Sequence, residues 1–176
     1  MDFVVTGGAG AVLLGAELPT GDVDVIYPMT EQNLANIAAA LKELDAQSKR
    51  YPGLRIDDLA ALLSGSDLWR WETKFGDLDM MTWASGAPRD YQALRQRAEV
   101  LQVGEHDVMV ASVDDLIAMK RTTGRLSDER KLLELQELKI LKEQARQAEQ
   151  PQSAKRQKPT ARRQSPRTRK PPERER

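Results

Sequence analysis

The sequence contains no cysteine, one histidine and no long apolar run. Without cysteine the chain forms no disulfide and offers no thiolate for zinc binding or nucleophilic catalysis, which is consistent with a reducing compartment. No segment approaches the ~20 apolar residues of a membrane-spanning helix, and the first residues lack the basic and apolar regions of a signal peptide. We therefore expect a cytoplasmic protein that does not bind membranes.

Charge of both signs is present in equal amounts but is unevenly distributed. The 176 residues include 27 Lys or Arg and 27 Asp or Glu, and 40% are hydrophobic, which suits one ordinary domain with an appendage. Residues 151–176 contain ten of the basic residues and two acidic ones, a net charge of +8, so residues 1–150 carry −8.

The basic segment 151–176 has no aromatic and no large aliphatic side chain. It cannot bury enough apolar surface to offset its ordering entropy, so its composition predicts a disordered tail. Its charge would attract the phosphates of RNA or DNA, or an acidic partner. A tail that only increases solubility is the alternative.

Hydrophobic periodicity predicts that strands and helices alternate along residues 1–150. Thr30 and Ser112 are expected to cap helices, Asp115 to complete a capping box after Ser112, and Gly124 to end that helix. The predicted strands are 2–6, 22–27, 68–74, 78–83, 100–103 and 108–111, and the predicted helices are 9–15, 30–47, 56–63, 90–98, 112–123 and 127–148.

This order predicts an α+β (α/β-like) fold in which a small mixed sheet is flanked by helices. We expect a core at residues 1–111, a helical extension at 112–150 and the disordered tail at 151–176.

Two tryptophans, Trp69 and Trp71, alternate along one predicted strand. We expect one of them to pack in the core and the other to be exposed, where base stacking is an alternative to plain exposure. His106 lies beside a predicted turn and is expected to be exposed and without a role.

Two aspartates, Asp22 and Asp24, interrupt an otherwise apolar strand with the sequence Asp-Val-Asp-Val. Residues two apart on a strand point to the same face, so the two carboxylates should project together. Neighbouring carboxylates repel, and unpaired burial is costly, so a cation should lie between them. With no cysteine and one histidine, an all-oxygen site for Mg²⁺ fits best.

A third carboxylate, Asp79, lies between Leu78 and Met80 on a later apolar strand. Packing alone would favour a hydrophobic residue there, so Asp79 is the candidate third metal ligand. Asp77 lies at the preceding turn and is expected to face solvent.

The glycine pair Gly7-Gly8 ends a predicted strand and opens a helix. Small residues at such a junction let backbone amides approach an anion. Phosphates beside Gly7 and Gly8 and metals at the three aspartates would form one site, suited to two-metal phosphoryl-type chemistry.

These motifs together resemble the DNA polymerase β-like nucleotidyltransferase superfamily: Gly-Gly, a gap of thirteen residues, Asp-Val-Asp-Val, then an apolar–Asp–apolar strand. The segment ASVDDLIAMKRTTGRLSDERKLLELQ (111–136) is similar to small bacterial members related to abortive-infection and minimal nucleotidyltransferases of toxin–antitoxin systems. The similarity covers roughly residues 3–138.

The resemblance implies a nucleotidyltransferase fold and a metal-dependent enzyme. Asp22, Asp24 and Asp79 would be catalytic and would bind Mg²⁺ or Mn²⁺. The residues implied to bind the nucleotide are Gly7, Gly8, Lys120, Arg125 and Asp128. The reaction would move a nucleoside monophosphate from an NTP to a hydroxyl of RNA (tRNA-like) or of a protein, within a toxin–antitoxin or phage-defence system. A cognate toxin or antitoxin is a further candidate partner.

The sequence departs from the family where Leu18 and Pro19 replace a basic residue before Thr20, and where no Ser or Thr follows Gly7. A catalytically inactive binding module and an antitoxin-like partner protein are therefore the alternatives. Each motif also has a structural alternative: a plain strand-to-helix turn at the glycines, edge-strand positions for the aspartates, a solvated Lys120, and helix capping by Arg125 and Asp128.

Overall fold

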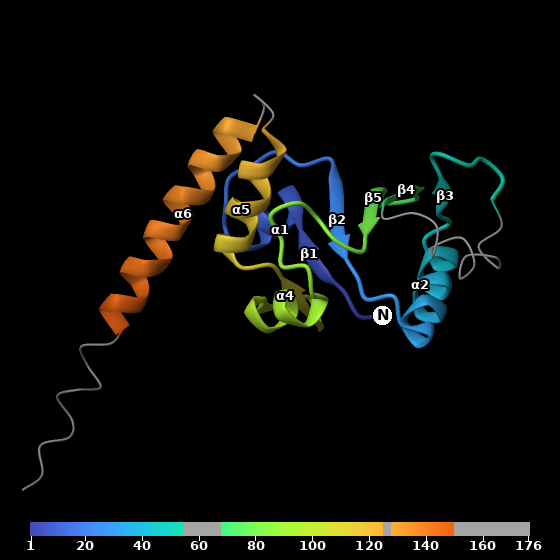
Figure 1. The fold of residues 1–176 in the computed structure, drawn as a ribbon, viewed down its shortest axis with the longest axis horizontal. Helices are drawn as coiled ribbons and strands as arrows, with labels where there is room; N and C mark the ends of the chain where they lie inside the picture. The colour runs from blue at the N-terminus through green and yellow to red at the C-terminus, as the bar shows by residue number, and fades with distance from the viewer. Residues whose placement is uncertain (55–67, 125–127, 150–176) are drawn as a thin grey trace, which may run out of the picture. The chain divides into compact units, whose positions relative to one another are not determined.

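The computed structural model describes residues 1–54, 68–124 and 128–149. The chain divides into two units, Met1–Lys142 and Glu143–Arg176, and the sheet lies in the first. The described residues form a mixed α+β fold with five helices and a seven-stranded mixed sheet (Figure 1), which confirms the predicted α+β class and mixed sheet. The predicted helix at 56–63 and the predicted tail at 151–176 lie outside the described residues, and the predicted boundary after residue 111 stays a prediction.

The sheet has the strand order β3-β4-β5-β2-β1-β7-β6. β2 pairs with β5, and β1 with β7, in parallel, whereas the other neighbours are antiparallel. Two antiparallel hairpins, β4–β5 and β6–β7, join consecutive strands of the sheet. The strands are β1 (Val4–Thr6), β2 (Asp22–Ile26), β3 (Gln47–Ser48), β4 (Leu68–Thr73), β5 (Gly76–Met81), β6 (Glu99–Val103) and β7 (His106–Val110).

Helix ends follow the predicted capping residues. The hydroxyl of Thr30 accepts from the N–H of Asn33 at 3.3 Å, and that of Ser112 accepts from the N–H of Asp115 at 3.2 Å. Gly124 ends its helix in the left-handed conformation, with φ +60°. The helices are α1 (Gly7–Leu13), α2 (Glu31–Glu43), α4 (Tyr91–Arg97), α5 (Val113–Thr123) and α6 (Asp128–Glu149). Among the described helices, none is both long enough and apolar enough to cross a membrane.

Both tryptophans of β4 are buried. Trp69 and Trp71 are 4% and 0% exposed, and their rings stack with centroids 5.8 Å apart. The prediction that one of them would be exposed was wrong, because residues two apart on a strand share a face. Both are core residues, so neither is available for base stacking. His106 is exposed, as predicted.

The segment after α2 differs from the prediction that this helix runs to residue 47. The helix ends at Glu43, because Asp45 adopts a left-handed conformation (φ 52°) and the N–H of Ala46 turns back to the carbonyl of Leu41. Gln47 and Ser48 then pair with β4 as the short edge strand β3. No glycine announces this helix end, so the sequence pattern missed it.

The loop after β5 packs closely against α5 at Gly86. Gly86 has φ +85°, and a Cβ there would lie 2.4 Å from the carbonyl oxygen of Ala118 in α5. The hydroxyl of Thr122 donates to the carbonyl of Ser85 at 2.8 Å. This close approach fixes α5, which carries Lys120, against the loop that follows the Asp79 strand.

We predict that Gly86→Ala destabilises the protein by at least about 1 kcal/mol, because it adds a left-handed side chain and a clash with backbone. Gly104→Ala is the matched control, since Gly104 also has a positive φ (+61°) but no atom within 4 Å of a Cβ. Urea unfolding measures both. Equal losses for the two variants would show that the approach to α5 contributes nothing.

Candidate functional site

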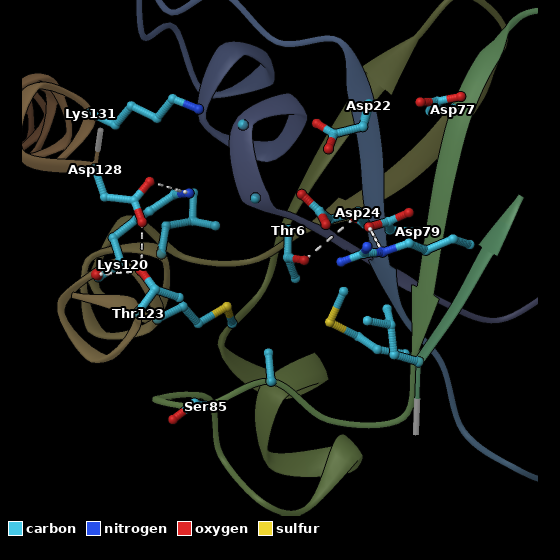
Figure 2. Close-up of a pocket in the computed structure, with 18 of the residues that line it drawn as sticks. Thr6, Asp22, Asp24, Asp77, Asp79, Ser85, Lys120, Thr123, Asp128 and Lys131 are labelled. Atoms are coloured by element: carbon cyan, nitrogen blue, oxygen red, sulfur yellow. Dashed lines mark hydrogen bonds and ion pairs between the residues drawn. The ribbon is translucent and has the colours of Figure 1, made fainter. Parts of the chain in front are cut away.

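Four carboxylates lie on one face of the sheet because β2 and β5 pair in parallel and in register. Asp22 is opposite Asp77, and Asp24 is opposite Asp79. Asp22, Asp24 and Asp79 each offer a carboxylate oxygen, and these atoms lie within 4.8 Å of one another. Figure 2 shows the four side chains along two adjacent strands. The structure thus brings together the three aspartates predicted from the sequence.

Asp77 was expected to face solvent at a turn, but β5 already begins at Gly76. Asp77 is half-buried, lines the same cavity as the other three aspartates, and forms an ion pair with Lys49. Its expected place in the turn was wrong, because the turn is one residue tighter than the sequence suggested, although its side chain is still 41% exposed. Lys49 therefore neutralises the fourth carboxylate.

Asp79 already has a cationic neighbour. Arg70, opposite it on β4, lies with its Nε 3.3 Å from a carboxylate oxygen of Asp79. Burial raises the pKa of Asp79, Arg70 lowers it and Asp22 raises it again, and the balance is a raised pKa. A metal ion at this carboxylate would compete with the guanidinium, so Arg70 would hold Asp79 in place until a metal binds.

Asp24 is the carboxylate of the group whose ionised form is most disfavoured. Burial raises its pKa to about 6, and the negative charges of Asp22 and Asp79 add to the effect, while Lys120 and Lys131 oppose it. Ionised Asp24 lacks an ion-pair partner within the part of the chain that the structure describes. A bound divalent cation would relieve this unfavourable charge.

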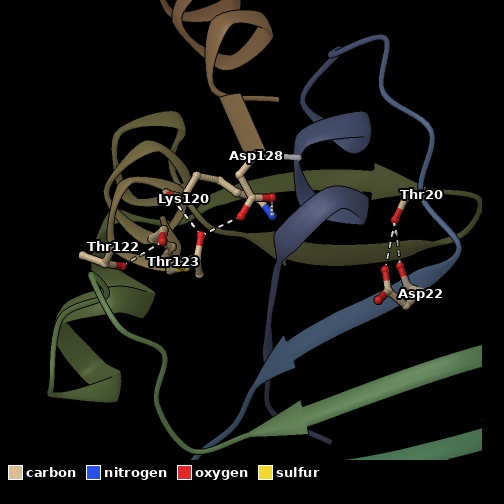
Figure 3. Close-up of polar contacts among 7 residues, drawn as sticks. Thr20, Asp22, Lys120, Thr122, Thr123 and Asp128 are labelled. Atoms are coloured by element: carbon tan, nitrogen blue, oxygen red, sulfur yellow. Dashed lines mark hydrogen bonds and ion pairs between the residues drawn. The ribbon is translucent and has the colours of Figure 1, made fainter. Parts of the chain in front are cut away.

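The glycine pair lies directly against the aspartates. Gly7 has φ +59°, and a Cβ there would lie 1.8 Å from Oδ2 of Asp24. At Gly8 a Cβ would lie 2.7 Å from the hydroxyl oxygen of Thr20. That hydroxyl donates to the carbonyl and to Oδ1 of Asp22, at 3.0 and 3.3 Å (Figure 3). Close approach therefore favours glycine at both positions, and Thr20 orients Asp22.

The opposite wall comes from α5 and the start of α6. Lys120 lies 3.3 Å from a carboxylate oxygen of Asp128, and the hydroxyl of Thr123 donates to the other oxygen at 2.7 Å (Figure 3). Burial alone would raise the pKa of Asp128, but the hydrogen bonds from Thr123 and Lys120 and the nearby positive charges lower it. Asp128 is thus an ionised, buried residue that holds Lys120. Arg125 lies outside the described residues.

One lysine of this wall, Lys131, was missed by the sequence analysis. It lies one helical turn after Asp128, is half-buried and lines the cavity. Its sequence context is a run of charged residues that looks like an ordinary solvated helix face, so only the packing of α6 reveals it.

The two walls enclose a cavity of about 810 Å³. Its acidic side is the sheet, its basic side is α5 and α6, and apolar side chains including Met81, Trp83 and Met119 complete the lining. A volume of this size accommodates a nucleotide-sized ligand. The arrangement suits an anion that carries divalent cations, because the ligand would contact both charge types at once.

No protein-family model matches the chain, and a search of the curated proteins finds no significant match.

We predict that Asp24→Asn stabilises the metal-free protein at neutral pH. Folding raises the pKa of Asp24 from 3.8 to about 6, so the folded state binds this proton more tightly than the unfolded chain, and stability falls as the pH rises through that window. The asparagine variant does not lose this stability. At pH 7 in EDTA its free energy of unfolding should exceed that of wild type by roughly 1 to 3 kcal/mol. The difference should vanish near pH 4.

Urea unfolding between pH 4 and 8 is the measurement. Asp107→Asn, at an exposed position outside the cavity, serves as the control and should show no such pH dependence. A less stable Asp24→Asn protein at pH 7 would mean that the carboxylate supports the fold rather than straining it.

Proposed function

We propose that this chain is a metal-dependent nucleotidyltransferase with the fold of the DNA polymerase β-like superfamily. It would transfer a nucleoside monophosphate from an NTP to a hydroxyl group. The observation that carries the proposal is the convergence of Asp22, Asp24 and Asp79 on one side of a cavity whose other side carries lysines. A purely structural role would not require three carboxylates to lie so close together.

The donor set fits a hard divalent cation. Asp22, Asp24 and Asp79 supply oxygens only, and the raised pKa of Asp24 reflects its burial and the negative charges of the other two, which a cation would offset. These three residues would hold Mg²⁺ or Mn²⁺. The bound ion would supply Lewis-acid neutralisation of phosphate charge and activation of the attacking hydroxyl.

The remaining residues of the cavity would hold the phosphates. Gly7 and Gly8 bring backbone against the aspartates without side-chain atoms in the way, and both line the cavity. Lys120, fixed by Asp128, would neutralise phosphate charge from the helical side. The acidic wall would thus bind the cations, and the basic wall would bind the phosphate anions.

In the proposed reaction the acceptor hydroxyl oxygen forms a bond to the α-phosphorus. The bond between that phosphorus and the oxygen bridging to the β-phosphate breaks, and pyrophosphate leaves with the bond's electron pair. The hydroxyl proton passes to Asp79. A carboxylate beside the reacting hydroxyl can accept this proton as a general base.

RNA is the favoured acceptor because the basic segment 151–176 would attract a polyanion that residues 1–150, at −8, would otherwise repel. A protein hydroxyl is the alternative acceptor. A place in a toxin–antitoxin or phage-defence system follows from the resemblance alone. An inactive binding module would bind NTP without turnover.

We predict that the protein transfers label from one α-labelled NTP to RNA or protein in a cell lysate, and that Asp22→Asn and Asp24→Asn each reduce transfer by about 100-fold or more. Asp77→Asn is the matched control, since Asp77 lies in the same cavity but is paired with Lys49. It should keep most of the transfer. Binding of NTP with no labelled product in any lysate fraction would identify an inactive module.

We predict that deletion of residues 151–176 leaves NTP binding intact but weakens RNA binding and flattens its salt dependence. The reason is counterion release, which contributes a slope of about −0.7 in log K against log [salt] for each single-strand phosphate neutralised. RNA affinity at several salt concentrations, for the full and shortened chains, is the measurement. Coinciding slopes would exclude the tail as the RNA-holding element and favour a protein acceptor.

A further inference from the structure

Lys131 is an unassigned cation at the candidate site. It lies in α6, is half-buried and lines the cavity with Gly7, Gly8 and the aspartates. Figure 2 shows its side chain extending from α6 into the space beside α1, above the pair formed by Lys120 and Asp128. Arg130, its neighbour in sequence, is exposed and does not line the cavity. Of these two neighbouring cations, only Lys131 is therefore part of the cavity wall.

The charge of this wall is not balanced by the residues that the structure describes. Lys120 is paired with Asp128, whereas Lys131 has no hydrogen bond or ion pair with any described residue. Lys131 nonetheless acts electrostatically on both Asp24 and Asp128, where it opposes a rise in pKa. Lys131 therefore lines the same cavity as Asp22, Asp24 and Asp79 but forms no ion pair with any of them.

We propose that Lys131 binds the terminal phosphates of the nucleotide, as a second cation beside Lys120 and opposite the aspartates. This rests on the proposed nucleotidyltransferase function and adds a residue that neither the motif pattern nor the resemblance assigns. A triphosphate has two charged groups beyond the α-phosphate, so a cation that contacts only these groups distinguishes it from a monophosphate. The ammonium group of lysine suits this role, because it acts as a compact charge with three donors.

The test is a calorimetric titration of the full-length protein with three Mg²⁺-containing ligands: each NTP, the corresponding NMP, and inorganic tripolyphosphate. Lys131→Gln should weaken binding of NTP and tripolyphosphate by about ten-fold, the loss expected for one charge-assisted contact. Its affinity for NMP should not change. Lys131→Arg should bind NTP and tripolyphosphate within about three-fold of wild type, because it keeps the charge, and Arg130→Gln should match wild type.

The three ligands separate failure of this inference from failure of the proposed function. Equal NTP and tripolyphosphate affinities for wild type and Lys131→Gln would overturn the role of Lys131 and leave the function standing. Loss of NMP affinity to the same extent would overturn it too, because it would indicate a general structural effect. Lys131-dependent binding of tripolyphosphate without NTP binding would support the phosphate subsite but overturn the nucleotide function. Absence of binding to all three ligands would overturn both.

Discussion

Mutual repulsion among three aspartates is the constraint on which the rest of the site depends. Parallel pairing of β2 with β5 puts Asp22, Asp24 and Asp79 on one face, and partial burial of Asp24 makes the repulsion costly. Around this group the described chain places cations: Arg70 forms an ion pair with Asp79, and Lys120 and Lys131 line the same cavity. Each cation lowers the cost without removing it, which is the arrangement expected where a metal ion completes the balance.

Close backbone packing is the second requirement, and it follows from the first. The carboxylate of Asp24 lies so near the start of α1 that only glycine fits at position 7, and Thr20 occupies the corresponding space at Gly8 while it orients Asp22. The glycines thus have a steric role in this structure whether or not a phosphate binds there. Unpaired buried carboxylates lower the stability of a fold, and apolar side chains in their place would avoid this cost.

The two walls of the cavity come from distant parts of the chain, and separate contacts hold them together. The sheet contributes the aspartates, and α5 and the start of α6 contribute the lysines. Gly86 brings the loop after β5 against α5, and Asp128 links α6 to α5 through Lys120 and Thr123. The proposed nucleotide with its metal ions would contact both walls through opposite charges, so its binding would stabilise the folded protein.

Local patterns by themselves determined the order of the described strands and helices except β3, the caps at Thr30 and Ser112, the helix end at Gly124 and the shared face of Asp22 and Asp24, because each depends on residues a few positions apart. Tertiary structure alone decided the rest. The β2–β5 register brings Asp77 and Asp79 beside the first pair, β4 brings Arg70, and the packing of α6 turns Lys131 inward. The left-handed conformation of Asp45 was not predicted because no glycine marks it. The joint burial of Trp69 and Trp71 was not predicted either, although residues two apart on a strand share a face. Partners separated by tens of residues meet only through sheet pairing and helix packing, and no local pattern encodes their register.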